Sequence, residues 1–361
     1  MTATHRIRVG GVHAYDIVIA PGAHAQLSDA QWPIKAKQLL LVSDTNVAPI
    51  YAATVQAQLQ SAGYEVSLHV IEAGEQSKNL ASFESLIETL ASIGARRDAC
   101  IVALGGGVVG DIAGFAAACW MRGIHFVQLP TSLLAMVDSS VGGKTGIDIP
   151  AGKNLLGAFH FPRAVVIDPE VLTTLPLRER AAGFAEVIKY GALGDAGFFT
   201  WLESQASALC ALEPIATARA IAACCQMKAD IVEADPFERG KRALLNFGHT
   251  FGHAIEAAQA FGGLNHGEAV AIGMCCAAKL SESLFGAPVQ DRQRLERLLA
   301  QFALPTRIPA ELDPAKLLAN MRLDKKADRN GLRFIVWDGI GQARIAEGIA
   351  DADVLAAMKA D

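Results

Sequence analysis

Residues 99–120 read ACIVALGGGVVGDIAGFAAACW, in which a glycine-rich turn joins a strand-like run to a helical one. ACIVAL is a short apolar run typical of a buried strand, and IAGFAAACW is typical of a helix. Between them, Gly105, Gly107 and Gly110 satisfy the pattern G-x-G-x-x-G. Such glycines let the backbone approach a pyrophosphate at a helix N-terminus, so the segment predicts a dinucleotide site. A tight strand-to-helix turn without a ligand is the alternative interpretation.

The same alternation of strand and helix extends over residues 1–176, where segments 47–63 and 80–94 have helical spacing. It predicts an α/β, Rossmann-like domain in which helices cover both faces of a parallel sheet. Residues 177–361 carry long alanine-rich stretches, which predict a second, mainly α-helical domain. The strand-like runs are YDIVIA (15–20), QLLLVSD (38–44), EVSLHVI (65–71), ACIVAL (99–104), HFVQLPT (125–131) and AVVIDPE (164–170); the alanine-rich stretches are 178–193, 215–233, 248–261 and 268–285.

The run HFVQLPT lacks the carboxylate that usually binds the ribose of a dinucleotide. Asp44 and Asn46 follow an earlier strand-like run and stand at its C-terminal end. We therefore expect these two residues to bind the ribose hydroxyls if a dinucleotide binds.

Composition excludes several classes of protein. Hydrophobic residues make up 52% of the 361 residues and charged residues 19%, which is typical of a compact globular enzyme. The net charge of −5 gives no basic field for nucleic acid. No apolar run approaches the roughly 18 residues of a membrane helix, and the N-terminus has no signal-like apolar region. Seven cysteines without any C-x-x-C spacing predict reduced thiols and a cytoplasmic protein.

Three of the nine histidines lie in NFGHTFGHAIEAAQAFGGLNHGE, residues 246–268. His249 and His253 are four residues apart and would share one face of a helix, so the spacing predicts that this pair binds one divalent ion. The glutamate of HExxH is missing, which excludes the zinc-protease chemistry that needs it. For each histidine, a structural residue on a partly apolar helix is the alternative.

The segment DSSVGGKTGID, residues 138–148, ends like a P-loop. Position 138 is aspartate where a P-loop needs glycine, so an ATPase is excluded. The glycines and Lys144, followed by Lys153 and Asn154, still suit a phosphate group. Exposed loop charges without a ligand are the alternative.

Taken together and in order, these motifs resemble those of the 3-dehydroquinate synthase family over essentially the whole chain. The resemblance implies an NAD-binding N-terminal domain, a metal-binding helical C-terminal domain and a homodimer. The motifs are SDTNV, GEQSK, GGGVVGD, MRG, QLPTSLLAMVDSSVGGKTGID, GKNLLGAF, AEVIKYG, LLNFGHTFGHAIE, HGEAVAIGM and LDKK.

The reaction that the resemblance implies belongs to the shikimate pathway of aromatic amino-acid biosynthesis. In it, 3-deoxy-D-arabino-heptulosonate 7-phosphate becomes 3-dehydroquinate and phosphate. The steps are transient oxidation by NAD, phosphate elimination, reduction, ring opening and an intramolecular aldol closure. The resemblance thus implies a carbon–oxygen lyase that regenerates its NAD.

The resemblance implies that Glu186, His249 and His266, in place of the histidine pair, bind the metal ion, zinc or cobalt. It also implies that His253 faces the substrate phosphate. Glu186 and Lys189 could otherwise form an i,i+3 pair on a helix surface. The apolar neighbours of Glu186 instead favour a buried carboxylate that needs a cation.

The resemblance also assigns the remaining residues. Those expected to hold the substrate phosphate are Lys144, Asn154, Asn246, His253 and Lys325 or Lys326, with Arg122 from the other subunit. Lys228 and Arg242 take the substrate carboxylate. The catalytic set is Asp138, Lys144, Lys189, Glu238 and His253. The NAD set is Asp44, Asn46, Gly74, Glu75, Lys78, Gly107, Val108, Val109, Gly110, Asp111, Thr131, Ser132, Lys144, Lys153, Val171, Leu172, Thr173 and Thr174.

Three alternatives stay open at this point. A sugar-phosphate cyclase of secondary metabolism would use NAD and a metal ion in the same way, but Lys228 and Arg242 favour a substrate that bears a carboxylate. A metal-dependent polyol dehydrogenase of related fold would release NADH. An inactive NAD-sensing protein would not need the metal ligands.

Overall fold

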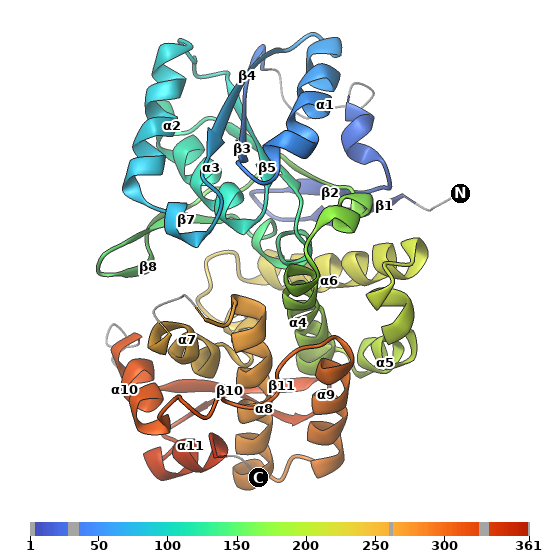
Figure 1. Cartoon of the computed structure of the whole chain (residues 1–361), viewed down its shortest axis with the longest axis vertical. Coiled ribbons are helices and arrows are strands. Elements are labelled where there is room, and N and C mark those ends of the chain that lie inside the picture. Colours follow the sequence, from blue (N-terminus) through green and yellow to red (C-terminus); the bar gives the residue numbers. More distant parts are fainter. Residues whose placement is uncertain (1–3, 28–35, 260–262, 325–331, 360–361) are drawn as a thin grey trace. The chain divides into compact units, whose positions relative to one another are not determined.

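The computed structural model describes residues 4–27, 36–259, 263–324 and 332–359 (Figure 1). The chain folds into two compact units. The first unit comprises Met1–Leu175 and Pro214–Phe237, and the second comprises Pro176–Glu213 and Glu238–Asp361. The chain first passes from one unit to the other after Leu175, next to the predicted domain boundary at residue 176. That single boundary does not account for residues 214–237, which belong to the first unit.

A seven-stranded sheet forms the centre of the first unit, in the order β1-β2-β9-β6-β5-β3-β4. The β1–β2 pair is antiparallel and every other pair is parallel. Six strands coincide with the predicted apolar runs, whereas β1 was not predicted. The strands are β1 (His5–Val9), β2 (Tyr15–Ile19), β3 (Gln38–Asp44), β4 (Glu65–Ile71), β5 (Cys100–Gly105), β6 (His125–Pro130) and β9 (Ala164–Ile167).

Helices cover both faces of this sheet, as the alternation predicted (Figure 1). Side chains alternate between the faces of a strand. On β3, Leu39 and Leu41 therefore pack with helix α1 (Ala48–Ser61). Leu40 and Val42 pack with α2 (Leu80–Ser92) and α3 (Gly107–Cys119) on the other face. Burial on both faces explains why the four central residues of β3, Leu39 to Val42, are all apolar.

Helix α6 (Pro214–Ala234) belongs to the first unit, where it packs against β1 and against the short helix η5 (Ala135–Ser139). The sequence predicts this helix in the second domain, because its alanine-rich composition resembles that of the helices before and after it. An alanine-rich surface packs closely on a strand or on a helix, so composition does not reveal its partner.

An antiparallel hairpin of β7 (Lys144–Ile149) and β8 (Gly152–Phe159) occupies the segment in which only a glycine-rich loop was recognised. Gly146 faces Gly157 across the hairpin. A Cβ added to Gly157 would lie 2.2 Å from the carbonyl oxygen of Thr145, so glycine is required by the close approach of two backbones.

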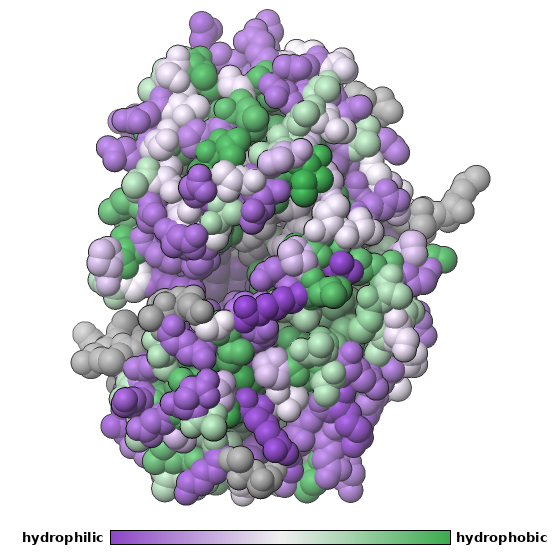
Figure 2. Space-filling view, viewed as in Figure 1, coloured by the Kyte–Doolittle hydropathy of each residue, from purple (hydrophilic) through white to green (hydrophobic). Residues whose placement is uncertain are grey.

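The described residues of the second unit are mainly helical, as predicted, and one hairpin adds to the helices. The hairpin, β10 (Arg333–Gly339) with β11 (Gln342–Glu347), was not predicted. No helix among the described residues has the length and apolar character to cross a membrane. On the face shown in Figure 2, hydrophilic and hydrophobic residues are interspersed over each unit. The helices are α4 (Leu177–Gly194), α5 (Ala196–Cys210), α7 (His249–Ala258), α8 (His266–Phe285), α9 (Val289–Gln301), α10 (Pro314–Asp324) and α11 (Asp351–Ala357).

All seven cysteines are free thiols, as predicted. Five of them are buried, and burial raises the pKa of both Cys225 and Cys276 to about 12. These thiols therefore stay protonated and act as small apolar side chains. Cys119 and Cys210 are exposed.

Candidate active site

Glu186 is a completely buried carboxylate on α4. Its Oε1 atom has no hydrogen-bond partner, and its Oε2 atom contacts the ammonium group of Lys189, which is 1% exposed. A surface ion pair is thus excluded, and the predicted burial of this carboxylate is confirmed. Because an unpartnered buried oxygen is unfavourable, Oε1 needs a further cationic or hydrogen-bonding partner.

Two imidazole rings face this oxygen. The Nε2 atoms of His249 and His266 each lie 3.7 Å from Glu186 Oε1. One donor atom from each of the three residues lies within 4.8 Å of the others. Ligand atoms around one tetrahedral zinc ion are about 3.4 Å apart, so the group fits a divalent ion of this size.

The opposite ring nitrogens fix the tautomers. His249 Nδ1 lies 3.2 Å from the carbonyl oxygen of Phe247, and His266 Nδ1 lies 3.2 Å from Glu256 Oε2. Both oxygens accept hydrogen bonds, so each neutral ring carries its proton on Nδ1 and directs the lone pair of Nε2 toward Glu186. Burial acts to lower the pKa of His266, but the hydrogen bond and the charge of Glu256 raise it above 6.5 overall.

Glycines allow the three helices that carry these ligands to approach closely. A Cβ on Gly267 would lie 2.2 Å from the carbonyl oxygen of Ala182, one turn before Glu186 on α4. A Cβ on Gly273 would lie 2.1 Å from the carbonyl oxygen of Gly248. No sequence motif marks Gly273, although this residue stands two turns after His266 on the same face of α8.

His253 lies beside this group but outside it. Its ring centroid is 5.5 Å from that of His249, so the two histidines share a helix face as predicted. Two groups of three donors occur among the described residues: Glu186 with His249 and His266, and His253 with Glu256 and His266. Neither contains both His249 and His253, and the geometry therefore does not support these two as paired ligands.

Three further predicted residues lie on the segment before α7. Arg242 is 2% exposed and belongs to a short helix, η7 (Lys241–Asn246). Asn246 Nδ2 donates to Glu238 Oε1 at 3.2 Å. Glu238 has a φ of 56°, a left-handed conformation that costs energy in a residue other than glycine. Glu238 and Asn246 are thus in direct contact.

The glycine-rich turn of the first unit joins β5 to α3. A Cβ on Gly110 would lie 2.6 Å from Gln128 Oε1 on β6, so this glycine lets the helix pack closely on the sheet. The first N–H groups of a helix have no partner within it. Gly107, Val108 and Val109 therefore present their N–H groups at this end of α3.

A buried lysine connects several predicted residues of the first unit. Lys78 is 5% exposed, and its Nζ lies 2.5 Å from Asp111 Oδ2 and 2.6 Å from Asn154 Oδ1. Nearby, Lys153 Nζ lies 3.2 Å from Glu75 Oε1. Burial acts to lower the pKa of Lys78, but Asp111 and Glu75 raise it overall. Burial raises the pKa of Asp111 despite the opposing charge of Lys78.

A second buried lysine holds the segment after β6. Lys228, on α6, donates to the carbonyl oxygen of Asp138 at 2.6 Å and to its Oδ1 at 2.7 Å. Thr131 is buried, and the hydroxyl of Ser132 accepts from the N–H of Ala135 at 3.2 Å. The structure thus brings Asp138 and Lys228 together, whereas Lys144 stands at the start of β7.

Several predicted cofactor residues serve local structure. Asp44 Oδ1 accepts from the N–H groups of Asn46 and Val47, each at 2.9 Å, and so stabilises the turn before α1. Gly74 has a φ of 107°. The side chains of Val171 and Leu172 are buried, so a ligand would meet only the backbone of these two residues.

Of the four remaining predicted residues, Thr173 and Thr174 make local hydrogen bonds, Arg122 is exposed, and Lys325 lies outside the described residues. The Thr174 hydroxyl lies 2.7 Å from that of Tyr51, and the Thr173 hydroxyl donates to the carbonyl oxygen of Glu170. Arg122 is exposed and has a φ of 70°. Lys325, with its neighbour Lys326, lies outside the described residues.

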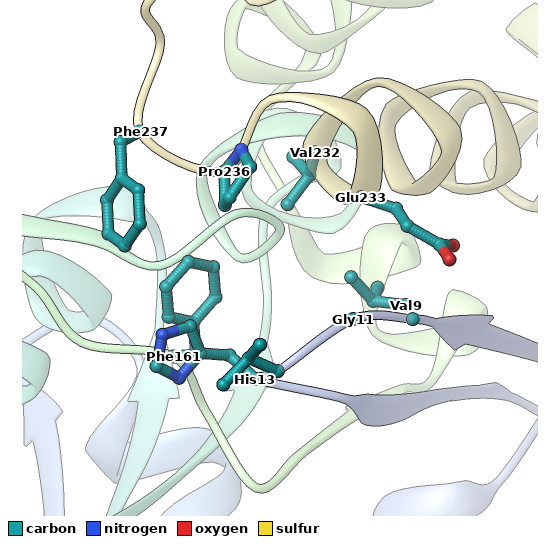
Figure 3. A pocket seen from close by; sticks show the side chains of 10 residues that line it. Val9, Gly11, His13, Phe161, Val232, Glu233, Pro236 and Phe237 are labelled. Carbon is teal, nitrogen blue, oxygen red and sulfur yellow. The ribbon is translucent and has the colours of Figure 1, made fainter.

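A separate cavity of about 310 Å³ lies in the first unit, and it contains none of the predicted site residues (Figure 3). The ring of His13 stacks on Phe161 with centroids 4.5 Å apart, and Phe237 stands edge-on to His13 at 6.3 Å. Glu233 adds a carboxylate to an otherwise mainly apolar lining.

Comparison with known proteins shows the same similarity along nearly the whole chain. Residues 68–182 match the family model described as 3-dehydroquinate synthase N-terminal, and residues 183–327 match the one described as 3-dehydroquinate synthase C-terminal. A 3-dehydroquinate synthase of Xanthomonas campestris pv. campestris (strain 8004) is 56% identical over 356 residues, which are 97% of this chain and 96% of that protein.

Two solved structures have the same fold. One is a 2-deoxy-scyllo-inosose synthase complexed with carbaglucose-6-phosphate, NAD+ and Co2+, with a TM-score of 0.90, 26% identity and 99% of each chain covered. The other is a 2-epi-5-epi-valiolone synthase from Streptomyces hygroscopicus subsp. jinggangensis 5008 with NAD+ and Zn2+ bound, with a TM-score of 0.88, 28% identity and 95% of each chain covered. Because both family models and a relative matched over nearly its full length agree, the chain belongs to the 3-dehydroquinate synthase family.

Proposed function

We propose that this chain converts 3-deoxy-D-arabino-heptulosonate 7-phosphate to 3-dehydroquinate and phosphate, with NAD and one divalent metal ion, zinc or cobalt. The proposal is carried by the group of buried Glu186 with His249 and the half-buried His266, found in a chain 56% identical to a 3-dehydroquinate synthase. The two structural neighbours, one with Co2+ and one with Zn2+, support the choice of metals.

The three metal ligands would be Glu186 Oε1 and the Nε2 atoms of His249 and His266. Three protein ligands leave coordination positions for substrate oxygens, as in catalytic zinc sites. When bound, the metal ion supplies Lewis acidity that makes a nearby substrate hydroxyl easier to ionise, and NAD supplies reversible oxidation. The ammonium group of Lys189 holds the second oxygen of Glu186 in place and can donate a hydrogen bond to a substrate hydroxyl.

The first unit would bind NAD. Its glycine-rich turn would approach the pyrophosphate, and the N-terminus of α3 would stabilise the negative charge there. The ion pair of Lys78 and Asp111 supports this assignment, because it places a buried cation and a partly exposed carboxylate on segments where cofactor contacts are expected. Asp44, with Oδ1 engaged by the backbone, would offer its other oxygen to the ribose.

Two buried cations support a carboxylate-bearing substrate over the substrates of the other cyclases. Lys228 is 6% exposed and Arg242 is 2% exposed. Lys228 already pairs with the carboxylate of Asp138 in this structure, and a substrate carboxylate would add a second anionic partner. We assign the substrate carboxylate to these two residues, and the phosphate to Lys144, Asn154, Asn246 and His253.

We further propose a homodimer that works in the cytoplasm. The exposed apolar side chains of Leu155, Leu156 and Phe159 on β8 support association, because a second copy would remove them from water. The seven free thiols support a reducing compartment. Analytical ultracentrifugation of the full chain measures the oligomeric state, and a monomer at micromolar concentration would contradict the dimer.

Incubation with the heptulosonate phosphate, a divalent metal and catalytic NAD tests the activity. We expect phosphate and 3-dehydroquinate to form in equal amounts over many turnovers for each NAD added. No phosphate release with metal supplied would reject the proposal. NADH accumulating in step with the consumed substrate would instead identify a polyol dehydrogenase.

A further inference from the structure

Glu256 is a buried carboxylate on the outer side of the metal group. Its side chain is 7% exposed, and its Oε2 lies 3.2 Å from His266 Nδ1. It stands near the end of α7, two turns after His249 and on the same helix face, whereas His266 begins α8. The residue is thus anchored on one ligand helix and contacts the first residue of the other.

The unpartnered oxygen of Glu186 explains why this contact matters. If His266 carried its proton on Nε2, that N–H would face the unpartnered Oε1 of Glu186, 3.7 Å away, and a small shift of the ring would bring the two into hydrogen-bond distance. The lone pair of the ring would then lie on Nδ1, facing Glu256, and Nε2 would have none for a metal ion beside Glu186. A carboxylate at Nδ1 favours the opposite tautomer, because it attracts the proton to Nδ1 and leaves Nε2 free.

We propose that Glu256 is a positioning residue that holds His266 in the tautomer and orientation required for metal binding. This inference rests on the proposed metal site. Glu256 raises the metal affinity of the chain without touching the ion. His249 needs no such side chain, because the carbonyl oxygen of Phe247 serves its Nδ1.

The second donor group provides the competing explanation. His253, Glu256 and His266 also have donor atoms within 4.8 Å of one another, so Glu256 could itself be a ligand. The substitution Glu256→Gln distinguishes the two roles, because it lowers metal affinity much more if Glu256 is a ligand than if it only positions His266. The amide oxygen of glutamine still accepts a hydrogen bond from Nδ1, but it is a much poorer metal ligand than a carboxylate.

Co2+ affinity of the full chain, measured by competition with a chromophoric chelator, tests the proposal together with the visible absorption of bound Co2+. For Glu256→Ala we expect affinity to fall about 10–100-fold with a shifted absorption band. For Glu256→Gln we expect a smaller but measurable loss of Co2+ affinity. The glutamine oxygen still accepts the hydrogen bond from His266 Nδ1, but the negative charge is lost. Glu296→Gln is the matched control, since this carboxylate pairs with Arg292 within the same unit, and we expect wild-type affinity.

Wild-type affinity and an unchanged band in Glu256→Ala would overturn the positioning role. Loss of binding in both Glu256 variants to the level of His266→Ala would identify a ligand and overturn it as well. If Glu256→Ala does not fold, Glu256→Gln decides, and affinity equal to wild type rejects the role. Failure of the wild-type chain to bind Co2+ would reject the proposed metal site itself. That outcome is distinct from rejection of the positioning role, which is judged from the Glu256 variants.

Discussion

His266 belongs to the proposed metal group and His253 lies beside it, so the two histidines have different expected roles. His266→Ala removes a ligand whose Nε2 faces Glu186 at 3.7 Å, so we expect loss of Zn2+ and Co2+ binding and of turnover. His253→Ala leaves the group of Glu186, His249 and His266 complete, so we expect metal to be retained while turnover is lost. Metal analysis of the purified variants and the phosphate-release assay measure both effects. Loss of metal from both variants would restore the paired-histidine interpretation.

A histidine outside the site, His24, gives a stability prediction. Its Nε2 lies 3.1 Å from the carbonyl oxygen of Val166, its Nδ1 has no partner, and burial lowers its pKa below 6.5 although Asp168 opposes the shift. The folded state thus keeps the ring neutral, while the unfolded chain binds a proton below pH 6.5. The stability linked to this group is complete above that pH and is lost as pH falls toward the folded pKa.

Urea unfolding of wild type and His24→Gln isolates this effect. We expect the free-energy difference between wild type and variant to shrink on going from about pH 7.5 to about pH 5.5, because only the wild type can protonate this residue. A difference that is the same at both pH values would contradict the prediction.

At this scale the sequence predicted part of the site. Apolar neighbours indicated that Glu186 is buried, and this was correct. Spacing favoured His253 as the partner of His249, since neighbours on one helix are visible in sequence. Spacing cannot reveal that Glu186, on a helix about sixty residues earlier, lies 3.7 Å from the Nε2 atoms of His249 and His266. The resemblance of the motifs supplied that information.

Between elements, the contact of α7 with α8 depends on a missing side chain. A Cβ on Gly273 would lie 2.1 Å from the carbonyl oxygen of Gly248 and 2.9 Å from the N–H nitrogen of Gly252. Both atoms belong to backbone, so Gly273→Ala forces the helices apart. We expect a loss of about 1–3 kcal/mol in the free energy of unfolding. Because His249 follows Gly248, metal affinity falls too.

Gly194→Ala is the matched control. This glycine ends α4 in the same unit, and a Cβ there would have no neighbour within 4 Å. We expect unchanged metal binding and stability within about 1 kcal/mol of wild type. Urea unfolding and Co2+ titration measure both variants, and equal stability of Gly273→Ala and Gly194→Ala would refute the packing argument.

Most elements were predictable because continuous apolar runs mark buried parallel strands. β1 was missed, although Ile7 and Val9 alternate with Arg6 and Arg8 as expected for a half-buried antiparallel strand. Its charged alternate positions reduce the apolar signal. The β7–β8 hairpin was missed for the opposite reason, because its glycines, which serve close backbone pairing, had been interpreted as ligand contacts.

At the level of the whole molecule, each unit carries its own proposed ligand. A ligand that binds only the folded state at 100 times its Kd stabilises that state by about 2.7 kcal/mol. We therefore expect NAD to slow hydrogen exchange most in residues 105–111 and 74–78, and Zn2+ to slow it most in residues 249–256 and around Glu186. Exchange mass spectrometry at saturating ligand measures both patterns. Unchanged exchange in residues 105–111 with NAD would contradict the proposed cofactor site.

The distribution of cysteines has a practical consequence at this scale. The two exposed thiols fall one in each unit, Cys119 at the end of α3 and Cys210 at the end of α5, while the other five are buried. Brief treatment of the native chain with maleimide dyes would therefore attach one fluorophore to each unit without any engineered cysteine. Energy transfer between a donor and an acceptor placed in this way would report on the separation of the units in solution as NAD, metal and substrate are added in turn.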